Sequence, residues 1–467
     1  MLTLLKTRNV ELYDALKLFA LEALTVIEAA ITKGAVIPTL SEFEWVQNGE
    51  EDSFSRQQAN KAEYFIFIYK MQDSIIELDS FKAAEAQFLT DAIWGSQVNK
   101  LIGNIMGRRR LELHQLLLGI PAYTLRKSDS VEFSERYFNE QVGKFESFFM
   151  TQIFEHKRIT PVYGLSITTN FMLTETISIE PLTNEDVIEF LDLGLISSQF
   201  SSSSFGDFIH QVPRTAIISR FSLPKVVGED NLDADVMTTL NDTTNSIYLN
   251  ETKVIDLLTL ILNVAVTPAA SIMKCVDSMI GTRQLQAYNA INAWTLPKVA
   301  LEENAQNMLL TLWPMLGENS PKSRHFLTIA VRRYSLAISR QALDDKLIDL
   351  MICAEALFLR TDQNELSFQL AYKAALLLGE NSEHKKEIFE FMKSTYNIRS
   401  KVVHGAKSFT QNQKDSQHLS ETTTKLAELL RNALLKMLNL ALNPQASKEL
   451  VDWKELMFSE EQKSNLT

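Results

Sequence analysis

The chain has 467 residues, of which 45% are hydrophobic and 22% are charged, a balance typical of a globular protein with a substantial core. This length allows about two or three domains. Gly (15 residues) and Pro (11 residues) are both scarce, which favours a helix-rich protein over a β protein with many turns. The net charge of −12 argues against a general nucleic-acid binder, because phosphate binding requires positive charge.

Neither cysteine predicts a disulfide or a metal site. Cys275 and Cys353 both lie in apolar, helix-like surroundings, and we interpret them as buried free thiols of a reduced compartment. No uncharged apolar run reaches the roughly 18 residues that a membrane span needs, and no signal-peptide cleavage pattern is visible. The sequence therefore predicts a cytoplasmic protein that does not span a membrane.

The first 150 residues predict helices. An apolar pattern from Leu12 to Ile27 predicts a long early helix, and Pro38 follows it. The stretch from about Arg56 to Leu118 contains no proline and has apolar residues at helical spacing, so it predicts a second long helical region.

The middle of the chain has a different pattern. Ile159–Glu180 is rich in Thr, Ile and Val with partial alternation, which predicts short strands, and Thr215–Val227 is a second β-like segment. Between them, Thr183 followed by Asp186 predicts the start of a helix. The segment Glu229–Asn245 is polar and turn-like, and helices are predicted to resume near residue 251.

The last third predicts a helical bundle. Apolar residues recur at spacings of three and four in successive segments, and the short connections between these segments imply antiparallel neighbours. Asp344 or Asp345 is a candidate cap, Ser382 is a candidate start and Gly379 a candidate stop. One predicted core stripe consists of Leu347, Leu350, Met351, Ala354, Leu357 and Phe358.

The candidate site lies at the end of a predicted helix, in the segment Tyr396–Gly405. Arg399 and His404 are five residues apart, so they do not share one narrow helical stripe. Both can still point outward when Ile398 and Val402 pack inward. The glycine that follows His404 places the imidazole at or near the helix end, where the helix dipole favours a cation.

These two side chains suit the cleavage of RNA by transesterification. The ribose 2′-OH attacks the neighbouring phosphorus, which leaves a 2′,3′-cyclic phosphate and a 5′-OH end. The reaction needs a proton acceptor, a proton donor and stabilisation of charge on the phosphoryl oxygens. His404 can serve the first two needs and Arg399 the third, while Ser400, four residues before His404, can orient the imidazole or contact the phosphate.

The sequence suggests no cofactor and no metal, because it lacks HxxxH, CxxC and clustered carboxylates. One arginine and one histidine are few groups for this reaction. Two copies of the chain facing each other across a two-fold axis would complete the site.

Structural interpretations of the same residues stay open. The pair can be an arginine in a surface ion pair and a histidine that merely ends a helix. Glu355 can orient Arg399 or the histidine across the bundle, or it can be a buried acid paired with Arg332 or Arg333. Tyr396 can stack on a base or pack in the core.

The charge is unevenly distributed along the chain. Between Pro321 and Lys407 there are 14 Lys and Arg residues and 10 Asp and Glu residues, so this window carries +4 and the remainder carries −16. An acidic body with a mildly basic C-terminal module fits RNA contact confined to one place. A surplus of this size also arises without any ligand, and both interpretations stay open.

Several segments together resemble a known family. They are Leu347–Phe358 (LIDLMICAEALF), Leu366–Ser367, Lys373–Gly379 (KAALLLG) and Tyr396–Gly405 (YNIRSKVVHG). In combination they resemble the Apea-like branch of the HEPN superfamily, over roughly Asn319–Asn443.

The resemblance implies a dimerising helical bundle and a metal-independent ribonuclease with its R-x4-6-H motif at the dimer cleft. It makes Arg399 the phosphate-binding arginine and His404 the catalytic histidine, and Ser400 falls where the family often has a small polar residue. Apea-like members are associated with antiviral defence in bacteria, which implies a toxin-like or anti-phage effector with a protein trigger or regulator at the N-terminal region. The family also contains members that bind RNA or protein without cutting, so a non-catalytic binding or sensor module is the alternative.

We therefore predict a mainly α fold, with a C-terminal HEPN-like helical bundle preceded by a helical N-terminal region and a small β-containing middle segment. The predicted parts are a helical region of unknown role (1–150), a mixed α/β segment (151–250), connecting helices (251–318), the Apea-like HEPN bundle (319–445) and a C-terminal tail (446–467).

Overall fold

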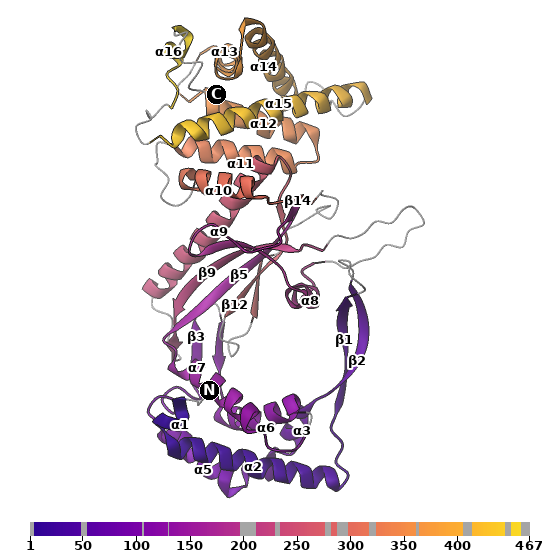
Figure 1. Cartoon of the computed structure of the whole chain (residues 1–467), viewed down its shortest axis with the longest axis vertical. Coiled ribbons are helices and arrows are strands. Elements are labelled where there is room, and N and C mark those ends of the chain that lie inside the picture. The colour runs from indigo at the N-terminus through magenta and orange to yellow at the C-terminus, as the bar shows by residue number, and fades with distance from the viewer. Residues whose placement is uncertain are drawn as a thin grey trace.

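The computed structural model is an elongated molecule in three tiers, with helices at both ends and a β-sheet between them (Figure 1). The predicted mainly α fold is confirmed. The structure describes residues 4–47, 54–104, 107–128, 130–196, 212–228, 234–275, 282–286, 298–316, 324–360, 364–404, 413–443 and 450–458.

The N-terminal tier is a helical layer around one apolar core. The predicted early helix is confirmed as α2, whose buried stripe runs from Leu12 to Ile27. The helices of this tier are α1 (Leu4–Arg8), α2 (Val10–Thr32), α3 (Tyr64–Lys70), α4 (Gln72–Ile76), α5 (Asp79–Thr90), α6 (Leu113–Ser128) and α7 (Glu135–Met150).

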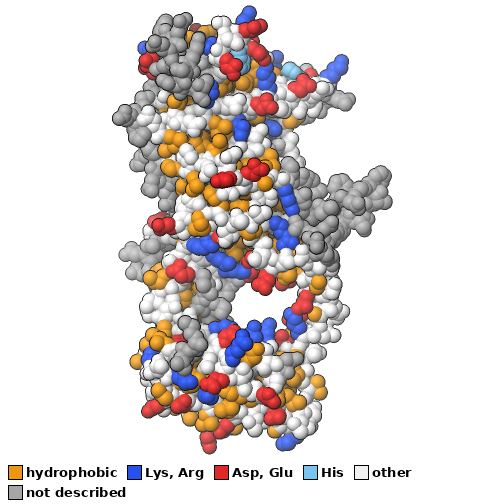
Figure 2. All heavy atoms as spheres, in the orientation of Figure 1, with side chains coloured by type: hydrophobic (Ala, Val, Ile, Leu, Met, Phe, Trp, Pro, Cys, Tyr) orange, Lys and Arg blue, Asp and Glu red, His pale blue; other side chains and the backbone are white. Residues whose placement is uncertain are grey.

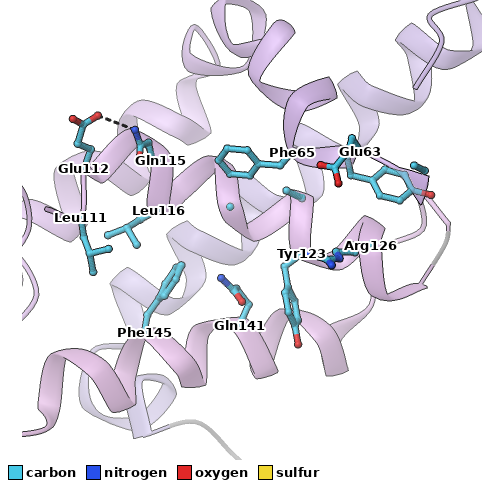
Figure 3. A pocket seen from close by; sticks show the side chains of 14 residues that line it. Glu63, Phe65, Leu111, Glu112, Gln115, Leu116, Tyr123, Arg126, Gln141 and Phe145 are labelled. Carbon is cyan, nitrogen blue, oxygen red and sulfur yellow. Dashed lines mark hydrogen bonds between the residues drawn. The ribbon is translucent and has the colours of Figure 1, made fainter. Parts of the chain in front are cut away.

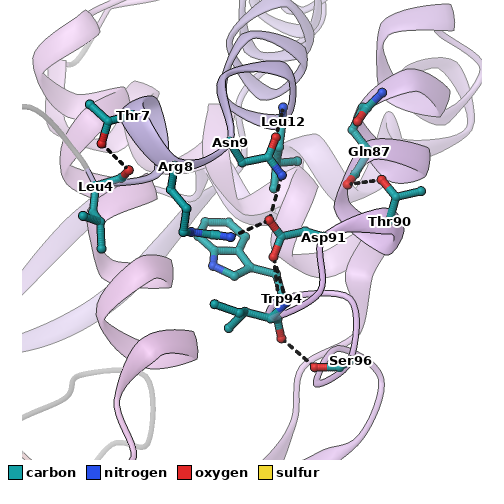
Figure 4. Close-up of polar contacts among 11 residues, drawn as sticks. Leu4, Thr7, Arg8, Asn9, Leu12, Gln87, Thr90, Asp91, Trp94 and Ser96 are labelled. Atoms are coloured by element: carbon teal, nitrogen blue, oxygen red, sulfur yellow. Dashed lines mark hydrogen bonds and ion pairs between the residues drawn. The ribbon is translucent and has the colours of Figure 1, made fainter.

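A buried carboxylate fixes the start of α2 to the loop that follows α5 (Figure 4). Asp91 accepts hydrogen bonds from the side chains of Arg8 at 2.8 Å and Asn9 at 2.7 Å. Its other oxygen accepts the backbone N–H groups of Ile93 and Trp94, both at 3.0 Å. Asn9 in turn caps α2, because its side-chain oxygen Oδ1 accepts the backbone N–H of Leu12, the third residue of the helix.

The prediction of continuous helix from about Arg56 to Leu118 is wrong. Its first residues form β2 (Phe54–Ala62), which pairs antiparallel with β1 (Thr39–Gln47), and a second hairpin follows in β3 (Leu101–Asn104) and β4 (Gly107–Arg110). The β2 sequence, FSRQQANKA, has little intrinsic strand preference. Pairing with β1 and burial of Phe54 against α8 (Asn184–Asp192) override that local preference.

The middle tier is a seven-stranded antiparallel sheet with the order β13-β12-β5-β9-β8-β7, in which β11 also pairs with β5. The strands predicted in Ile159–Glu180 and Thr215–Val227 are confirmed, and so is the helix start at Thr183, which forms a reciprocal capping box with Asp186. The strands are β5 (Ile153–Tyr163), β7 (Phe171–Met172), β8 (Ile177–Pro181), β9 (Thr215–Pro224), β11 (Thr267–Pro268), β12 (Ser271–Cys275) and β13 (Thr282–Gln286).

Two short pairings lie beside this sheet. Strand β10 (Val226–Val227) pairs with β3 of the N-terminal tier, and β14 (Val299–Ala300) runs parallel to β6 (Leu165–Ser166). The first of these pairings ties the sheet to the N-terminal helices.

Two predictions after residue 228 are wrong. The polar segment Glu229–Asn245 is predicted to be turn-like. Residues 229–233 lie outside the described ranges, and from Ala234 the segment is the first part of α9 (Ala234–Leu262), whose later turns are buried against the sheet. Residues 251–318 were predicted as connecting helices, yet they also include β11 to β14, along with α10 (Glu303–Leu316). A short apolar run such as that of β12 cannot be told from helix by periodicity alone.

The two faces of the sheet are covered differently. One face packs on α9, and this core continues without interruption into the C-terminal helices. The Tyr334 hydroxyl donates to Asn263 at 2.7 Å, and the Arg431 guanidinium donates to the carbonyls of Leu260 and Ile261 at the end of α9. The opposite face packs on α8.

The C-terminal tier is the predicted helical bundle. The whole predicted core stripe of α12, from Leu347 to Phe358, is buried. The predicted stop at Gly379 and the predicted start at Ser382 are confirmed in α13 and α14. The predicted cap at Asp344 or Asp345 is wrong, because Ala342 is the N-cap of α12 and both acids lie in its first turn. The helices are α11 (His325–Ser339), α12 (Leu343–Phe358), α13 (Leu366–Leu378), α14 (Ser382–Val403), α15 (Gln413–Ala441) and α16 (Trp453–Phe458).

The β1–β2 hairpin bridges the lower two tiers and closes a ring. Phe54 is buried and Trp45 half-buried against α8, and the Asn184 side chain donates to that of Gln47. Figure 2 shows an opening through the molecule between the N-terminal tier, this hairpin and the sheet, with Lys and Arg side chains gathered at parts of its edge.

Both cysteines are buried and free, as predicted, with Cys275 in β12 and Cys353 in α12. Among the helices that the structure describes, none is long and apolar enough to cross a bilayer.

Candidate functional site

Arg399 and His404 lie at the C-terminal end of α14. The helix ends at Val403 and His404 is its C-cap, with its backbone N–H donating to the carbonyl of Ser400 at 3.1 Å. The imidazole is exposed and the arginine is half-buried. Both functional groups therefore belong to the last turn and a half of one helix, whose dipole favours positive charge at this end.

The apolar residues of the same turn explain why the polar ones face outward. Ile398 and Val402 pack against the bundle core, as expected. Tyr396 packs against the same core and is half-buried, so the packing interpretation of this residue fits the structure better than an open stacking platform. Ser400 is half-buried, and its hydroxyl forms no hydrogen bond within the described part of the chain.

Glu355 of α12 is the acid that faces Arg399 across the bundle. One of its carboxylate oxygens lies 3.7 Å from Nη2 of Arg399, and the two side chains are 30% and 26% exposed. This separation is an ion pair but is too long for a hydrogen bond. The guanidinium Nε is buried without a hydrogen-bond partner among the described residues and so is closed to a ligand, and the donors left for a phosphate are those of the Nη groups.

The two alternative partners of Glu355 interact with other acids, Arg332 electrostatically with Asp256 and Arg333 in an ion pair with Asp349. Arg333 Nη1 lies 2.7 Å from Asp349, and Arg340 Nε lies 3.2 Å from the other oxygen of the same carboxylate. The acid that pairs with Arg333 is therefore Asp349 and not Glu355, and the sequence did not indicate it. It stands within the apolar run of α12, and an acid at such a position is the signal that could have identified it.

A second buried charge pair, also unanticipated, fastens α9 to the sheet. Arg158 of β5 lies 3.0 Å from Glu251 of α9, whose carboxylate also accepts the hydroxyls of Thr160 at 3.1 Å and Ser219 at 2.9 Å. Burial raises the pKa of Glu251 to about 7, and Arg158 and the two hydroxyls oppose that rise. The cluster joins two elements of the core, and we interpret it as structural.

The Arg399–His404 site can bind an anion and exchange a proton. A guanidinium can hold two oxygens of a phosphate, and an imidazole can serve as a general acid or base. In the part of the chain that the structure describes, no three His, Cys, Asp or Glu side chains are grouped as metal ligands. Gly405 and the residues up to 412 lie outside the described ranges.

Comparisons of the chain with protein-family models, with curated proteins and with solved structures found no match.

Proposed function

We propose that this chain is a metal-independent RNA endonuclease that cuts by 2′-OH transesterification, with Arg399 and His404 as its catalytic residues. The observation that supports it best is the end of α14, where an exposed imidazole follows, within a turn and a half, a guanidinium with unoccupied donors. The resemblance of this segment to the R-x4-6-H motif supports the same assignment.

The proposed reaction assigns one role to each group. The imidazole of His404 accepts the proton of the ribose 2′-OH as the O2′–P bond forms. Arg399 donates two N–H groups to the non-bridging phosphoryl oxygens, where negative charge develops. The P–O5′ bond then breaks, and the leaving 5′-oxygen takes up a proton. Glu355, 3.7 Å from the guanidinium, acts as a positioning residue.

Two copies of the chain would complete the site. One imidazole cannot be the base and the acid in the same step, so a second histidine from a facing copy is a natural proton donor. We therefore propose a homodimer formed through the C-terminal bundle, working in the cytoplasm, whose reducing conditions suit two buried free thiols. The biological role implied by the resemblance is a toxin-like or anti-phage effector that a protein trigger controls through the N-terminal tier.

End-group analysis of RNA cleavage tests the proposal. Purified wild type should cut single-stranded or looped RNA in EDTA and leave 2′,3′-cyclic phosphate and 5′-OH ends. We expect His404→Ala to lower the rate roughly 10²- to 10⁴-fold, because it removes general acid–base catalysis. Arg399→Lys should also lower the rate, because an ammonium cannot bind two oxygens in a fork.

His384→Ala is the matched control, since His384 is a half-buried histidine at the opposite end of the same helix. Equal rates of RNA cleavage by wild type and His404→Ala would overturn the proposal.

A non-catalytic RNA- or protein-binding module is the second candidate. It is favoured by the partly exposed Arg399–Glu355 pair, which is also a common structural contact. In that case Arg399→Ala weakens RNA binding in a filter-binding assay, while no cyclic-phosphate end appears with any variant.

A further inference from the structure

A cavity of about 260 Å³ lies in the N-terminal tier, between α3, α6 and α7 and next to the end of β2 (Figure 3). This volume is just below the range of about 300–1,000 Å³ that is usual for small-molecule sites. Much of its wall is apolar, and Figure 3 shows Phe65 on one side and Phe145 opposite it. Phe65 is 47% exposed, unusually high for a large aromatic side chain. Phe145 is only 1% exposed and packs edge-on against Trp94, so the exposed ring of Phe65 is the surface on which a flat ligand can stack.

Gly119 keeps this space open. It stands in the middle of α6, where glycine costs about 1 kcal/mol relative to alanine. A Cβ atom built there would meet no atom within 4 Å, so neither packing nor a left-handed backbone requires glycine. Because the residue lines the cavity, any larger side chain would extend into it. The glycine is therefore a local cost to helix stability that preserves the cavity.

The side-chain carboxamides of Gln141 and Gln115 supply polar groups that can hydrogen-bond to the edge of a ligand ring. The side chain of Gln141 is half-buried, points into the cavity in Figure 3 and forms no hydrogen bond within the described ranges. Gln115 donates one N–H to Glu112 at 3.1 Å and keeps its carbonyl oxygen for another partner. A carboxamide presents a donor beside an acceptor, which matches the hydrogen-bonding edge of a nucleobase.

Charged groups lie together at another part of the cavity wall. Arg126 is exposed and forms no hydrogen bond or ion pair within the described part of the chain, and Figure 3 shows it near Glu63. A free guanidinium suits a phosphate, and a carboxylate suits the hydroxyls of a ribose.

Tyr123 forms a rigid wall beside them. Its hydroxyl donates to Glu140 and accepts from Lys144 at 2.8 Å. The Lys144 ammonium also lies 4.1 Å from the centre of its ring.

We propose that this cavity binds a nucleotide, with the base stacked on Phe65, the ribose toward Glu63 and the phosphate on Arg126. The nucleotide can be free or can be one unstacked residue of an RNA strand, because both present the same base, ribose and phosphate. The site is separate from Arg399 and His404, and its assignment does not depend on the proposed nuclease activity.

Calorimetric titration of the full chain with adenosine 5′-monophosphate, guanosine 5′-monophosphate and a single-stranded RNA decamer tests the proposal. Mononucleotide binding that Gly119→Leu abolishes assigns a free ligand. Decamer binding that Gly119→Leu abolishes, without mononucleotide binding, assigns a strand, whereas decamer binding that Gly119→Leu leaves intact belongs to another site. We expect Gly119→Leu to abolish binding and Gly119→Ala to retain it, because one methyl group leaves most of the space. Arg126→Gln should weaken mononucleotide binding roughly tenfold through loss of a charged hydrogen bond to phosphate, and should leave adenosine binding unchanged.

Ala83→Leu is the matched control, since it creates a leucine at an exposed position of α5, away from the cavity, and adds three carbons where Gly119→Leu adds four. The variant His404→Ala should bind as wild type does, so failure of the nuclease proposal would not affect this result. Absence of binding by all three ligands, or equal binding by wild type and a folded Gly119→Leu protein, would overturn the proposal.

Discussion

Arg399 is positioned by packing and by a loose ion pair. Its Nε is buried without a partner in the described part of the chain, and Glu355 approaches only to 3.7 Å. A partly exposed pair of this kind contributes at most about 1 kcal/mol to stability. The carboxylate therefore matters more for the orientation of the guanidinium than for the stability of the bundle, and this leaves the arginine available to an incoming phosphate.

His156 is a residue whose burial should make stability depend on pH. Its side chain is almost fully buried in β5, and its ring stacks on Phe221 at 5.4 Å between centroids. Burial lowers the pKa of His156 to about 4, although Glu155 opposes the shift. The folded protein keeps this imidazole neutral at a pH at which the unfolded chain, with a pKa of about 6.5, takes up a proton.

The contribution of His156 is therefore complete above about pH 6.5 and is lost as the pH falls toward 4. Between pH 7.5 and 5 we expect wild type to lose about 2 kcal/mol more unfolding free energy than His156→Phe, which keeps a ring against Phe221 but does not titrate. Urea unfolding at both pH values measures the difference. Parallel losses in the two proteins would show that His156 is not responsible.

Among the elements, the β1–β2 hairpin depends most clearly on its neighbours. Phe54 is 1% exposed in a cluster with Val187 and Phe190 of α8, and the Arg214 guanidinium lies 5.2 Å from its ring. An isolated two-stranded hairpin is marginally stable in water. The contact with α8 therefore holds the hairpin in place and closes the ring seen in Figure 2.

Phe54→Ala should release this hairpin from α8. Loss of a buried phenylalanine costs about 3–5 kcal/mol, and here the loss falls on one docking contact. We expect amide hydrogen exchange to accelerate in residues 39–62 and to stay unchanged in α12 and α14. Val46→Ala, at a position that is 38% exposed in the same hairpin, is the control and should exchange as wild type does. Uniform acceleration across the chain would instead indicate global destabilisation.

Helices with a strong apolar repeat were predictable as elements. In α12 every predicted core position is buried. Its apolar side chains form one stripe along the helix, and packing that stripe against the bundle removes them all from water. The strand β2 was not predictable, because its pairing comes from β1 and the burial of Phe54 comes from α8, which lies far along the chain. The polar first part of α9 was also not predictable from local sequence. It is helical because it continues the apolar last turns of the helix, which are held in the core.

Across the whole molecule, the C-terminal bundle is docked on the rest of the chain. One core runs from the sheet through α9 into α11, α12 and α15, so the bundle shares buried surface with the middle tier. A change in the sheet or in α9 can therefore reach the helices that carry the candidate site. The predicted boundary near residue 318 stays a prediction, because the core continues across it.

Dependence on concentration tests the proposed dimer. If the site is complete only when two copies meet, specific RNA-cleaving activity should fall as the protein is diluted below the dimer dissociation constant. Mass photometry on the same samples should show the dimer fraction falling in parallel. Constant activity per chain across a range in which the dimer dissociates would mean that one copy contains the whole site.

By itself, the sequence determined the mainly α character, the bundle core, the buried free cysteines and the place of Arg399 and His404 at a helix end, because apolar periodicity and helix-stop residues act locally. Only the tertiary structure decided that Glu355 faces Arg399, that Asp349 pairs with Arg333, and that the β1–β2 hairpin closes on α8. Such contacts join elements far apart in the chain, and their energies arise only when burial brings the partners together.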